Sequence, residues 1–309
     1  MNILFMGTPE FAVPCLRALI ESSDNVCGVV TQPDKPAGRG HRLTPPPVKI
    51  LAEEHGIPVF QPETLKDFAF SEHLEKLNPE LIIVVAYGKI LPEYILNFPK
   101  YGCINMHASL LPKYRGAGPI QWSVLNGEEK TGVTSMLMEK GLDTGDMLLK
   151  CETKIGEYET ASELHDRLMV MGADLLIETI EALKNGTLIP EKQDDNLSCY
   201  APMISKEMAK IDWSKPAREV INLICGMNSW PVAHTDYLGE FMKVYRAVIG
   251  NTAKGECGKI VSADSKGLEV ICGDGKTIII DEIQFKGSKA MRVKDYLNGH
   301  EIKVGEILD

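Results

Sequence analysis

Short apolar runs alternate with helical patterns through the first half of the chain, and this alternation limits the folds open to it. Residues 3–6 form a strand-like run, and Gly7 and Thr8-Pro9 then suit the start of a helix that reaches about Glu21. Further apolar runs of strand length recur at 26–31, 59–60, 81–86, 104–106 and 133–138. Such alternation is typical of βαβ units. We therefore predict an α/β fold with a Rossmann-like, doubly wound, mostly parallel sheet.

The stretch from 32 to 47 interrupts this pattern, because its Pro and Gly residues are too frequent for regular structure. A helix is expected after it, over residues 48–55. Within the stretch, residues 35–42 (KPAGRGHR) have no acidic side chain and carry four basic ones, Lys35, Arg39, His41 and Arg42. A structureless loop of about fifteen residues inside a compact domain usually has a function. The alternative is a connection whose charges only keep it in water.

A net charge of −10 ordinarily argues against a nucleic-acid partner, because phosphate binding relies on clustered Lys and Arg. The charge is unevenly distributed, however. Residues 206–309 contain 15 basic and 15 acidic residues, so the whole deficit lies in residues 1–205. A polyanion would therefore be bound by a local basic segment such as 35–42.

The second half of the chain predicts a long helix, a linker and a separate β-rich domain. Thr160 and Glu163 have the spacing of a capping box at the start of that helix. Periodicity is then lost, and we predict a linker at 190–205 between a catalytic domain, 1–189, and a C-terminal domain, 206–309. After a helix that follows Pro216, short β-branched runs separated by turn residues predict a small OB-like β-barrel, a kind of fold that binds oligonucleotides.

Composition and cysteine usage are typical of a cytoplasmic protein. The chain has 309 residues, 44% of them hydrophobic and 25% charged, which suffices for two domains. Its eight cysteines are scattered without any Cys-x-x-Cys pair, so we expect reduced thiols and no metal site. No apolar run reaches the roughly 20 residues that span a bilayer, and the start of the chain lacks a secretory signal pattern. We predict a cytoplasmic location and no membrane partner.

The turn after the first strand reads GTPEFA (7–12) and lacks the G-x-G-x-x-G spacing of a dinucleotide site. Ligands of an open parallel sheet bind beyond the carboxyl ends of its strands, which draws attention to the strand at 104–106. In an extended segment, Asn105 and His107 point to the same side. A glycine-flanked loop, GLDTGD (141–146), could present Asp143 to that imidazole. Each residue alone has an ordinary explanation, such as a turn-forming aspartate, but their combination is much harder to explain in that way.

With the segment SLLPKYRGAGP (109–119) added, these motifs make the chain similar to the 10-formyltetrahydrofolate-dependent formyltransferase family. The resemblance implies a catalytic trio of Asn105, His107 and Asp143. It implies 10-formyltetrahydrofolate as the formyl donor and no metal. It also implies a folate site in the first domain, lined by Val85, Ala86, Tyr87, Gly88, Ser109, Leu110, Leu111, Pro112, Arg115 and Gly116.

Over the whole chain, the similarity is strongest to the branch of this family that formylates initiator methionyl-tRNA for translation initiation. The start MGTPEFA (6–12), the loop QPDKPAGRGHRLTPPPVK (32–49) and the second domain carry this similarity. Glycinamide ribonucleotide formyltransferases are single-domain enzymes without the loop, and sugar-nucleotide formyltransferases lack the basic insertion. The resemblance therefore implies tRNA contacts by Lys35, Arg39, His41 and Arg42. We expect the protein to act as a monomer.

Formyl transfer to an amine passes through a tetrahedral carbon that bears a developing oxyanion. Asn105 is expected to donate a hydrogen bond to that oxyanion, and His107 to donate to it and to handle the proton. Asp143 is expected to orient His107 and to raise its basicity. No covalent enzyme intermediate is needed.

Three alternatives remain open at this point. The same chemistry could act on a sugar nucleotide or another small amine, which the basic loop and the barrel disfavour. A folate- or RNA-binding regulator with a disabled site would not need all three members of the trio. A nicotinamide oxidoreductase would share the sheet but is disfavoured by the missing glycine fingerprint.

Overall fold

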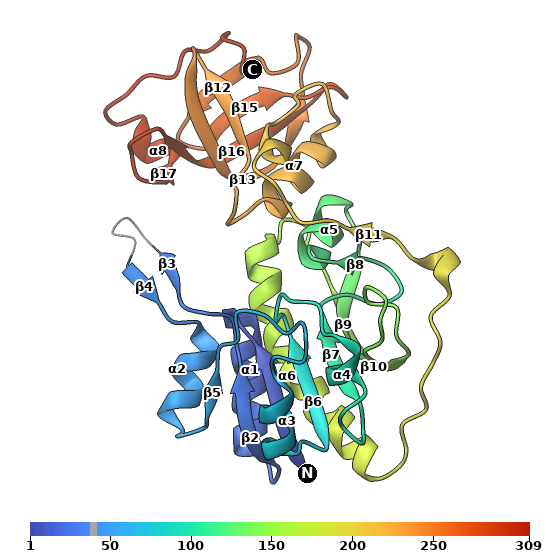
Figure 1. Ribbon diagram of the computed structural model, residues 1–309. Helices are drawn as coiled ribbons and strands as arrows, with labels where there is room; N and C mark the ends of the chain where they lie inside the picture. The colour runs from blue at the N-terminus through green and yellow to red at the C-terminus, as the bar shows by residue number, and fades with distance from the viewer. Residues whose placement is uncertain (38–41) are drawn as a thin grey trace. The chain divides into compact units, whose positions relative to one another are not determined.

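The computed structural model describes residues 1–37 and 42–309, which divide into two compact units (Figure 1). The first unit contains Met1–Gly116, Gly132–Thr153 and His165–Tyr200. The second unit contains Ala117–Thr131, Lys154–Leu164 and Ala201–Asp309. Two segments that precede the predicted linker thus belong to the second unit. The boundaries drawn above for the catalytic domain, the linker and the C-terminal domain stay a prediction.

A seven-stranded sheet of order β10-β9-β7-β6-β1-β2-β5 forms the centre of the first unit (Figure 1). Its strands are β1 (Asn2–Gly7), β2 (Asn25–Val30), β5 (Val59–Phe60), β6 (Leu81–Val85), β7 (Cys103–His107), β9 (Lys130–Leu137) and β10 (Met147–Lys154). In this order, β7, β6, β1, β2 and β5 are each parallel to their neighbours among these five strands. Strand β9 pairs antiparallel with β7. The predicted Rossmann-like, mostly parallel sheet is confirmed, because each apolar run expected to be a strand in this unit is one.

Helices cover this sheet because its central strands are apolar on both faces. They are α1 (Val13–Glu21), α2 (Pro47–Glu54), α3 (Ser71–Leu77), α4 (Glu93–Leu96) and α6 (Ala161–Lys184). One face packs with α3 and α4 in a single buried cluster that includes Leu4, Met6, Leu74, Ile82, Val84 and Ile95. Neither α1 nor α6 contributes to this cluster, and Gly172 of α6 lies against Cys15 of α1 and Val133 of β9 instead. The sheet is therefore wound on both sides, with its carboxyl-terminal edge left for a site.

The stretch from 32 to 47 departs from the prediction. A short hairpin of β3 (Lys35–Ala37) and β4 (Arg42–Thr44) pairs antiparallel, with Lys35 opposite Thr44. The expectation of no regular structure was therefore wrong. Each strand of a two-stranded ribbon has one edge without a partner, where a proline such as Pro36 removes no ladder hydrogen bond. Residues 38–41 lie outside the described part of the chain.

Two helix starts show how far local signals predict boundaries. The first helix was expected to begin at Thr8-Pro9, but a 3₁₀ turn, η1 (Glu10–Ala12), precedes α1. An earlier start would put Pro14 inside the helix, where it has no N–H to donate, whereas the observed start puts it in the first turn. The capping box is confirmed: the Thr160 N–H donates to Glu163 Oε2 over 2.9 Å, and the Glu163 N–H donates to Thr160 Oγ1 over 3.2 Å.

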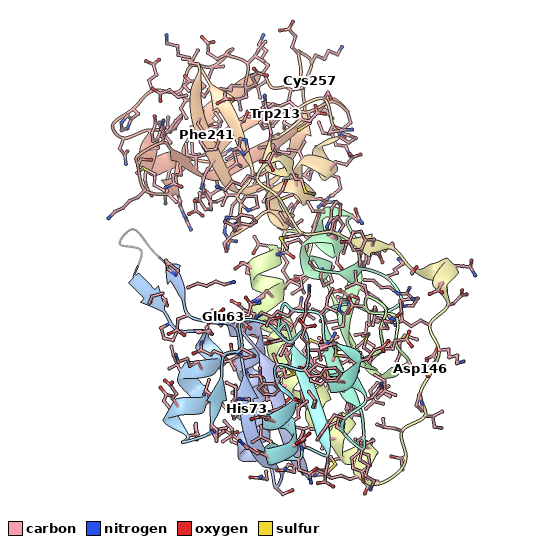
Figure 2. The ribbon with its side chains drawn as sticks, viewed as in Figure 1. Glu63, His73, Asp146, Trp213, Phe241 and Cys257 are labelled. Atoms are coloured by element: carbon pink, nitrogen blue, oxygen red, sulfur yellow. The ribbon has the colours of Figure 1, made fainter. Side chains whose placement is uncertain are left out.

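The second unit is built on an antiparallel sheet of order β12-β13-β16-β15-β14, with β17 beside β16 (Figure 1). Its elements are α5 (Pro119–Leu125), η3 (Glu207–Ala209), α7 (Ala217–Gly226), β12 (His234–Tyr237), β13 (Glu240–Thr252), β14 (Ile260–Asp264), β15 (Gly267–Ile271), β16 (Lys276–Phe285), β17 (Met291–Arg292) and α8 (Val293–Tyr296). Figure 2 labels Trp213, in the turn before α7, and Phe241, in β13. The predicted helix after Pro216 is α7.

The last five residues close this sheet into a barrel. Asp236 of β12 exchanges backbone hydrogen bonds of 2.8 and 3.1 Å with Asp309. On the other side, Ile260 of β14 donates to the carbonyl of Glu306 and accepts from the N–H of Gly305, both over 2.9 Å. The C-terminal segment thus joins the two edge strands, and the predicted small β-barrel is confirmed.

The segment predicted as a linker is ordered along the first unit over much of its length. It contains η2 (Asp195–Leu197) and β11 (Tyr200–Ala201), and β11 pairs with β8 (Arg115–Gly116). The Arg115 N–H donates to the Cys199 carbonyl over 2.9 Å, and Met147 and Glu191 exchange two backbone hydrogen bonds of 2.8 Å.

Within the described residues, no helix has both the length and the apolar character needed to cross a membrane.

Candidate active site

Asn105 and His107 lie at the carboxyl end of β7, near the middle of the sheet. Their side chains leave the strand on the same side, because they are two residues apart. The neighbouring strand β6 pairs with β7 through Val84 and Asn105, which brings residues 85–88 to the same edge. Asn105 is half-buried, and its side-chain amide has no hydrogen-bond partner among the described residues. Its N–H groups are therefore available to a bound molecule.

The buried ring of His107 is held by a main-chain carbonyl. Its Nε2 lies 2.9 Å from the carbonyl oxygen of Tyr114. Because a carbonyl only accepts hydrogen bonds, Nε2 carries the proton. The other ring nitrogen, Nδ1, then has the lone pair in the neutral ring, and it lies 3.7 Å from Asp143 Oδ2. His107 can thus accept a proton at Nδ1, beside a carboxylate that stabilises the imidazolium.

Asp143 lies in the loop between β9 and β10, and this loop places its carboxylate beside His107. Its backbone has φ = 52°, a left-handed conformation that is rare for a residue other than glycine. The carboxylate is oriented by the Gly116 N–H, which donates to Oδ2 over 2.8 Å. Asp146, labelled in Figure 2, ends this loop, and its carbonyl accepts from the Leu137 N–H. The structure therefore brings all three members of the predicted trio together.

The loop after β7 is shaped by buried hydroxyl groups. Ser109 Oγ donates to the Lys113 carbonyl over 2.7 Å, and Thr134 Oγ1 donates to the Ser109 carbonyl over 2.7 Å. The same Thr134 oxygen accepts from the Leu111 N–H over 3.1 Å. The peptide bond before Pro112 is cis. These contacts fix the path of the chain that presents the Tyr114 carbonyl to His107.

The predicted folate residues occupy different environments within this loop. The Leu111 side chain is buried in a cluster with Met136 and Met147, and Leu110 lies against Gly132. Arg115 donates from Nε to Gln193 Oε1 over 3.0 Å and from Nη2 to Asp195 over 2.7 Å. Ser109 is buried, whereas Pro112 and Gly116 are half-buried beside the trio. Contact of these residues with folate stays a prediction.

The other predicted folate residues, Val85 to Gly88, form a sharp turn after β6. Ala86 and Gly88 have φ of 47° and 79°. The Tyr87 carbonyl accepts from Thr8 Oγ1 and Gln32 Nε2, over 3.1 and 2.9 Å. Burial raises the pKa of the Tyr87 phenol to about 12, so this group stays neutral. Tyr87 is thus hydrogen-bonded to Gln32, which begins the basic loop (residues 32–49).

A cluster of polar side chains, formed by Asp34, Lys49 and Gln61, holds the two ends of this loop together. Lys49 Nζ lies 3.0 Å from both carboxylate oxygens of Asp34 and donates to Gln61 Oε1 over 2.9 Å. Gln61 in turn donates to the carbonyl of Gln32 and to Asp34. Lys35 is exposed and donates to Gln32 Oε1 over 2.7 Å. Of the other predicted tRNA contacts, Arg39 and His41 lie outside the described residues, and only the backbone of Arg42 is described.

Two other kinds of catalytic group, a metal ion and a cysteine thiol, can be examined among the described residues of the first unit. None of their His, Cys, Asp and Glu side chains gather in a group of three or more that could hold a metal ion. Cys103, at the start of β7, is a free thiol whose pKa is raised to about 12 by burial. It is therefore not a nucleophile at neutral pH.

Two groups that touch the trio were not found from the sequence. The Tyr114 carbonyl belongs to the main chain, so no side-chain pattern indicates it. Gln193 donates from Nε2 to the carbonyls of Asp143 and Gly145, over 2.8 Å each. It lies 50 residues from Asp143 in the sequence, within the segment predicted as a linker, and only the fold reveals the contact.

Family models match nearly the whole chain. A formyl transferase model covers residues 1–180, and a model of the formyl transferase C-terminal domain covers residues 203–301.

Relatives of known name extend this match from end to end. A methionyl-tRNA formyltransferase of Clostridium novyi (strain NT) is 52% identical over 310 aligned residues, which cover 100% of both chains. The methionyl-tRNA formyltransferase of Alkaliphilus oremlandii (strain OhILAs) is 53% identical, over 100% of this chain and 99% of its own. A solved N-formyltransferase of Helicobacter canadensis, in complex with folinic acid and dTDP-3-aminofucose, has a TM-score of 0.69 at 21% identity and covers 91% of this chain and 98% of its own. At that identity the likeness is one of fold.

Proposed function

Because the chain belongs to the formyl transferase family, among its methionyl-tRNA formyltransferases, we propose that it transfers the formyl group of 10-formyltetrahydrofolate to the free amino group of initiator methionyl-tRNA. The product is N-formylmethionyl-tRNA, used in translation initiation. The observation that carries this proposal is the meeting of Asn105, His107 and Asp143 at the carboxyl edge of the sheet. Translation takes place in the cytoplasm, which supports the expected location.

The residues fit a formyl donor that needs no metal. The half-buried Asn105 amide has free donors, and the neutral His107 ring has its lone pair at Nδ1. When bound, the folate supplies the formyl carbon on its N10 atom, and the protein supplies a hydrogen-bond donor and a base. Asn105 donates to the oxygen of the tetrahedral carbon, a type of contact worth about 3 kcal/mol when one donor is removed.

The reaction also requires a group that takes a proton from the attacking amine and passes it to N10 of the folate. The attacking α-amino group has a pKa near 7.7 to 8.0, so much of it is neutral at physiological pH. When its nitrogen bonds to the formyl carbon, His107 Nδ1 accepts the excess proton, while Nε2 remains bonded to Tyr114. The imidazolium next to Asp143 donates to the oxyanion and then protonates N10 as the carbon–N10 bond breaks. Proton transfer by a positioned side chain contributes roughly a hundred- to ten-thousandfold in rate.

Product analysis tests this reaction. Incubation with 10-formyltetrahydrofolate and methionyl-tRNA should yield N-formylmethionine after deacylation, with one tetrahydrofolate released for each formyl group transferred. Release of tetrahydrofolate without formylated methionine would contradict the proposal.

The basic loop is proposed to contact the acceptor stem, with the barrel holding other parts of the tRNA. Replacing both Arg39 and Arg42 by alanine should raise the KM for methionyl-tRNA, because two phosphate contacts are lost, and should leave the KM for the folate almost unchanged. Each lost contact should also flatten the dependence of log affinity on log salt by roughly 0.7 to 0.9. Steady-state kinetics at several salt concentrations measure both effects. An unchanged tRNA KM together with an unchanged salt slope would make the loop a mere connector.

The base of the loop offers a test among described residues. Lys49→Met should raise the KM for methionyl-tRNA several-fold, because it removes the cation that bonds to both Asp34 and Gln61 and so weakens the cluster at the base of the hairpin, in which the bonds of Gln61 to Asp34 and Gln32 remain. Its control is Lys66→Met, at an exposed position of the same unit. The kcat at saturating tRNA should change little in both variants. Equal tRNA KM values in the two variants would show that the cluster does not position the loop.

A sugar nucleotide is the alternative acceptor. It is supported by the fold of the Helicobacter canadensis enzyme but has no support in sequence identity. The identity of about half of all residues with methionyl-tRNA formyltransferases over the full chain favours tRNA. The protein is proposed to act as a monomer.

A further inference from the structure

Gln193 makes three side-chain hydrogen bonds around the loop that carries Asp143. Both of its Nε2 bonds go to main-chain carbonyls of that loop, those of Asp143 and Gly145, at 2.8 Å each. Its Oε1 accepts from Arg115 Nε over 3.0 Å. An amide side chain has two N–H donors and one carbonyl acceptor, so every polar group of Gln193 is in use. The residue is half-buried, although the positions on both sides of it are exposed.

The same residue links the loop to the group that orients the carboxylate. Arg115, which Gln193 holds, directly precedes Gly116, and the Gly116 N–H donates to Asp143 Oδ2 over 2.8 Å. Asp195 accepts from Arg115 Nη2 over 2.7 Å and holds the guanidinium from the other end. Gln193 therefore connects the backbone of Asp143 with the strand whose N–H binds the Asp143 side chain.

Apart from Gln193, the contacts of this loop include the bond from the Leu137 N–H to the Asp146 carbonyl, the bond from the Gly116 N–H to Asp143, and a bond from Thr144 Oγ1 to Glu139 over 2.8 Å. Asp143 has φ = 52°, a conformation that an L-residue keeps only when its surroundings impose it. Leu142, the residue before it, is 56% exposed and therefore anchors the loop only weakly by apolar burial. The Asp143 carboxylate is already 3.7 Å from His107 Nδ1, so a small displacement would separate the two groups.

We infer that Gln193 is a positioning residue, which holds the Asp143 carboxylate beside His107 through the loop backbone. The inference rests on the proposed formyl transfer and goes beyond it, because Gln193 touches neither His107 nor any group that reacts. Through Asp143 it acts on the rate of the chemical step, whereas its bond to Arg115 supports a predicted folate residue.

Two variants separate the contacts of Gln193. Gln193→Ala removes all three hydrogen bonds. Gln193→Glu keeps the shape and the acceptor for Arg115 but replaces the donor group by an oxygen that faces two carbonyls. Each should lower kcat about ten- to a hundredfold, since a misplacement of about 1 Å can cost roughly a hundredfold. Gln193→Glu, which keeps the acceptor for Arg115, should leave both KM values within about twofold of the native ones. Lys192→Gln changes the net charge by the same amount as Gln193→Glu, at the exposed neighbouring position, and should leave kcat unchanged.

A double-mutant cycle with Asp143→Asn distinguishes positioning from general support of the fold. If Gln193 acts only by placing the carboxylate, Gln193→Glu should have almost no further effect on kcat in the Asp143→Asn background. Single-turnover formyl transfer to methionyl-tRNA measures all four proteins, and thermal unfolding checks that each is folded. If Gln193 acts through Asp143, any change in the pH profile of kcat should be the same in Gln193→Glu and in Asp143→Asn.

Native kcat in both folded Gln193 variants would overturn the inference, and so would fully additive losses in the cycle. Should Gln193→Ala be unstable, the Gln193→Glu arm and its cycle decide alone. Failure of the proposed function would look different, because the native enzyme itself would then transfer no formyl group to methionyl-tRNA.

Discussion

Asn105→Ala, His107→Ala and Asp143→Ala are each expected to lower kcat by at least about a hundredfold while the fold persists. Asn105 is the proposed oxyanion donor, and its removal should cost about 3 kcal/mol of transition-state stabilisation. His107→Ala removes the proposed acceptor of the amine proton, whose ring is fixed by the Tyr114 carbonyl. Loss of Asp143 leaves the imidazolium without its carboxylate. Because all three are proposed to act in the transition state, kcat and kcat/KM should fall together.

His165→Ala provides a matched control for the His107 variant. His165 Nδ1 lies 3.0 Å from Asp166 Oδ1, so it has a carboxylate neighbour like that of His107, but on the surface of α6. Its removal should leave kcat unchanged. Steady-state kinetics with circular dichroism compare the four variants. Near-native turnover in two of the three trio variants would remove them from the mechanism.

Gly145→Ala is expected to lower kcat by about a hundredfold or more through the backbone of the Asp143 loop. A Cβ atom at this position would lie 1.7 Å from the carbonyl oxygen of Leu137. Because that oxygen belongs to the strand β9 and cannot move aside, the loop must shift instead and break the bond from Gln193 to the Gly145 carbonyl. A displacement of about 1 Å in a reacting group can cost roughly a hundredfold in rate.

Gly172→Ala is the control, since it adds the same methyl group elsewhere in the same unit. A Cβ at Gly172 would meet Val133 and Cys15 at 3.8 to 4.0 Å, which is ordinary van der Waals contact. Alanine inside α6 should also stabilise the protein by about 0.5–1 kcal/mol, because glycine is a poor helix former. Kinetics and thermal unfolding would measure both variants. A native kcat for Gly145→Ala would mean that the loop does not need its present conformation.

Local signals in the sequence predicted most of the fold. The apolar runs became strands because their residues are buried on both sheet faces, as in β6, where all five residues are buried. The Thr160 and Glu163 pair fixed a helix start through two reciprocal hydrogen bonds. The β3–β4 hairpin was missed because Pro36 and the surrounding turn residues indicate irregular structure, whereas the Lys49 cluster joins the two ends of the loop. Long-range contacts of this kind have no local signature.

The same limit applies to the candidate site. Asn105, His107 and Asp143 could be predicted because their motifs resemble those of a family. The Tyr114 carbonyl and the Gln193 amide could not, since the first is main chain and the second is one polar residue in an aperiodic segment. Barrel closure was hidden in a similar way, because residues 305–309 lack an alternating pattern and join the two edge strands through backbone hydrogen bonds.

The choice of acceptor tests the central claim most directly. Formyl-labelled 10-formyltetrahydrofolate would be offered to the enzyme with methionyl-tRNA, with a dTDP-amino sugar, or with no acceptor. We predict label in the tRNA fraction, on the methionine amino group, and none above background in the other two reactions. Label in the amino sugar with none in the tRNA, or no transfer to either acceptor, would contradict the account.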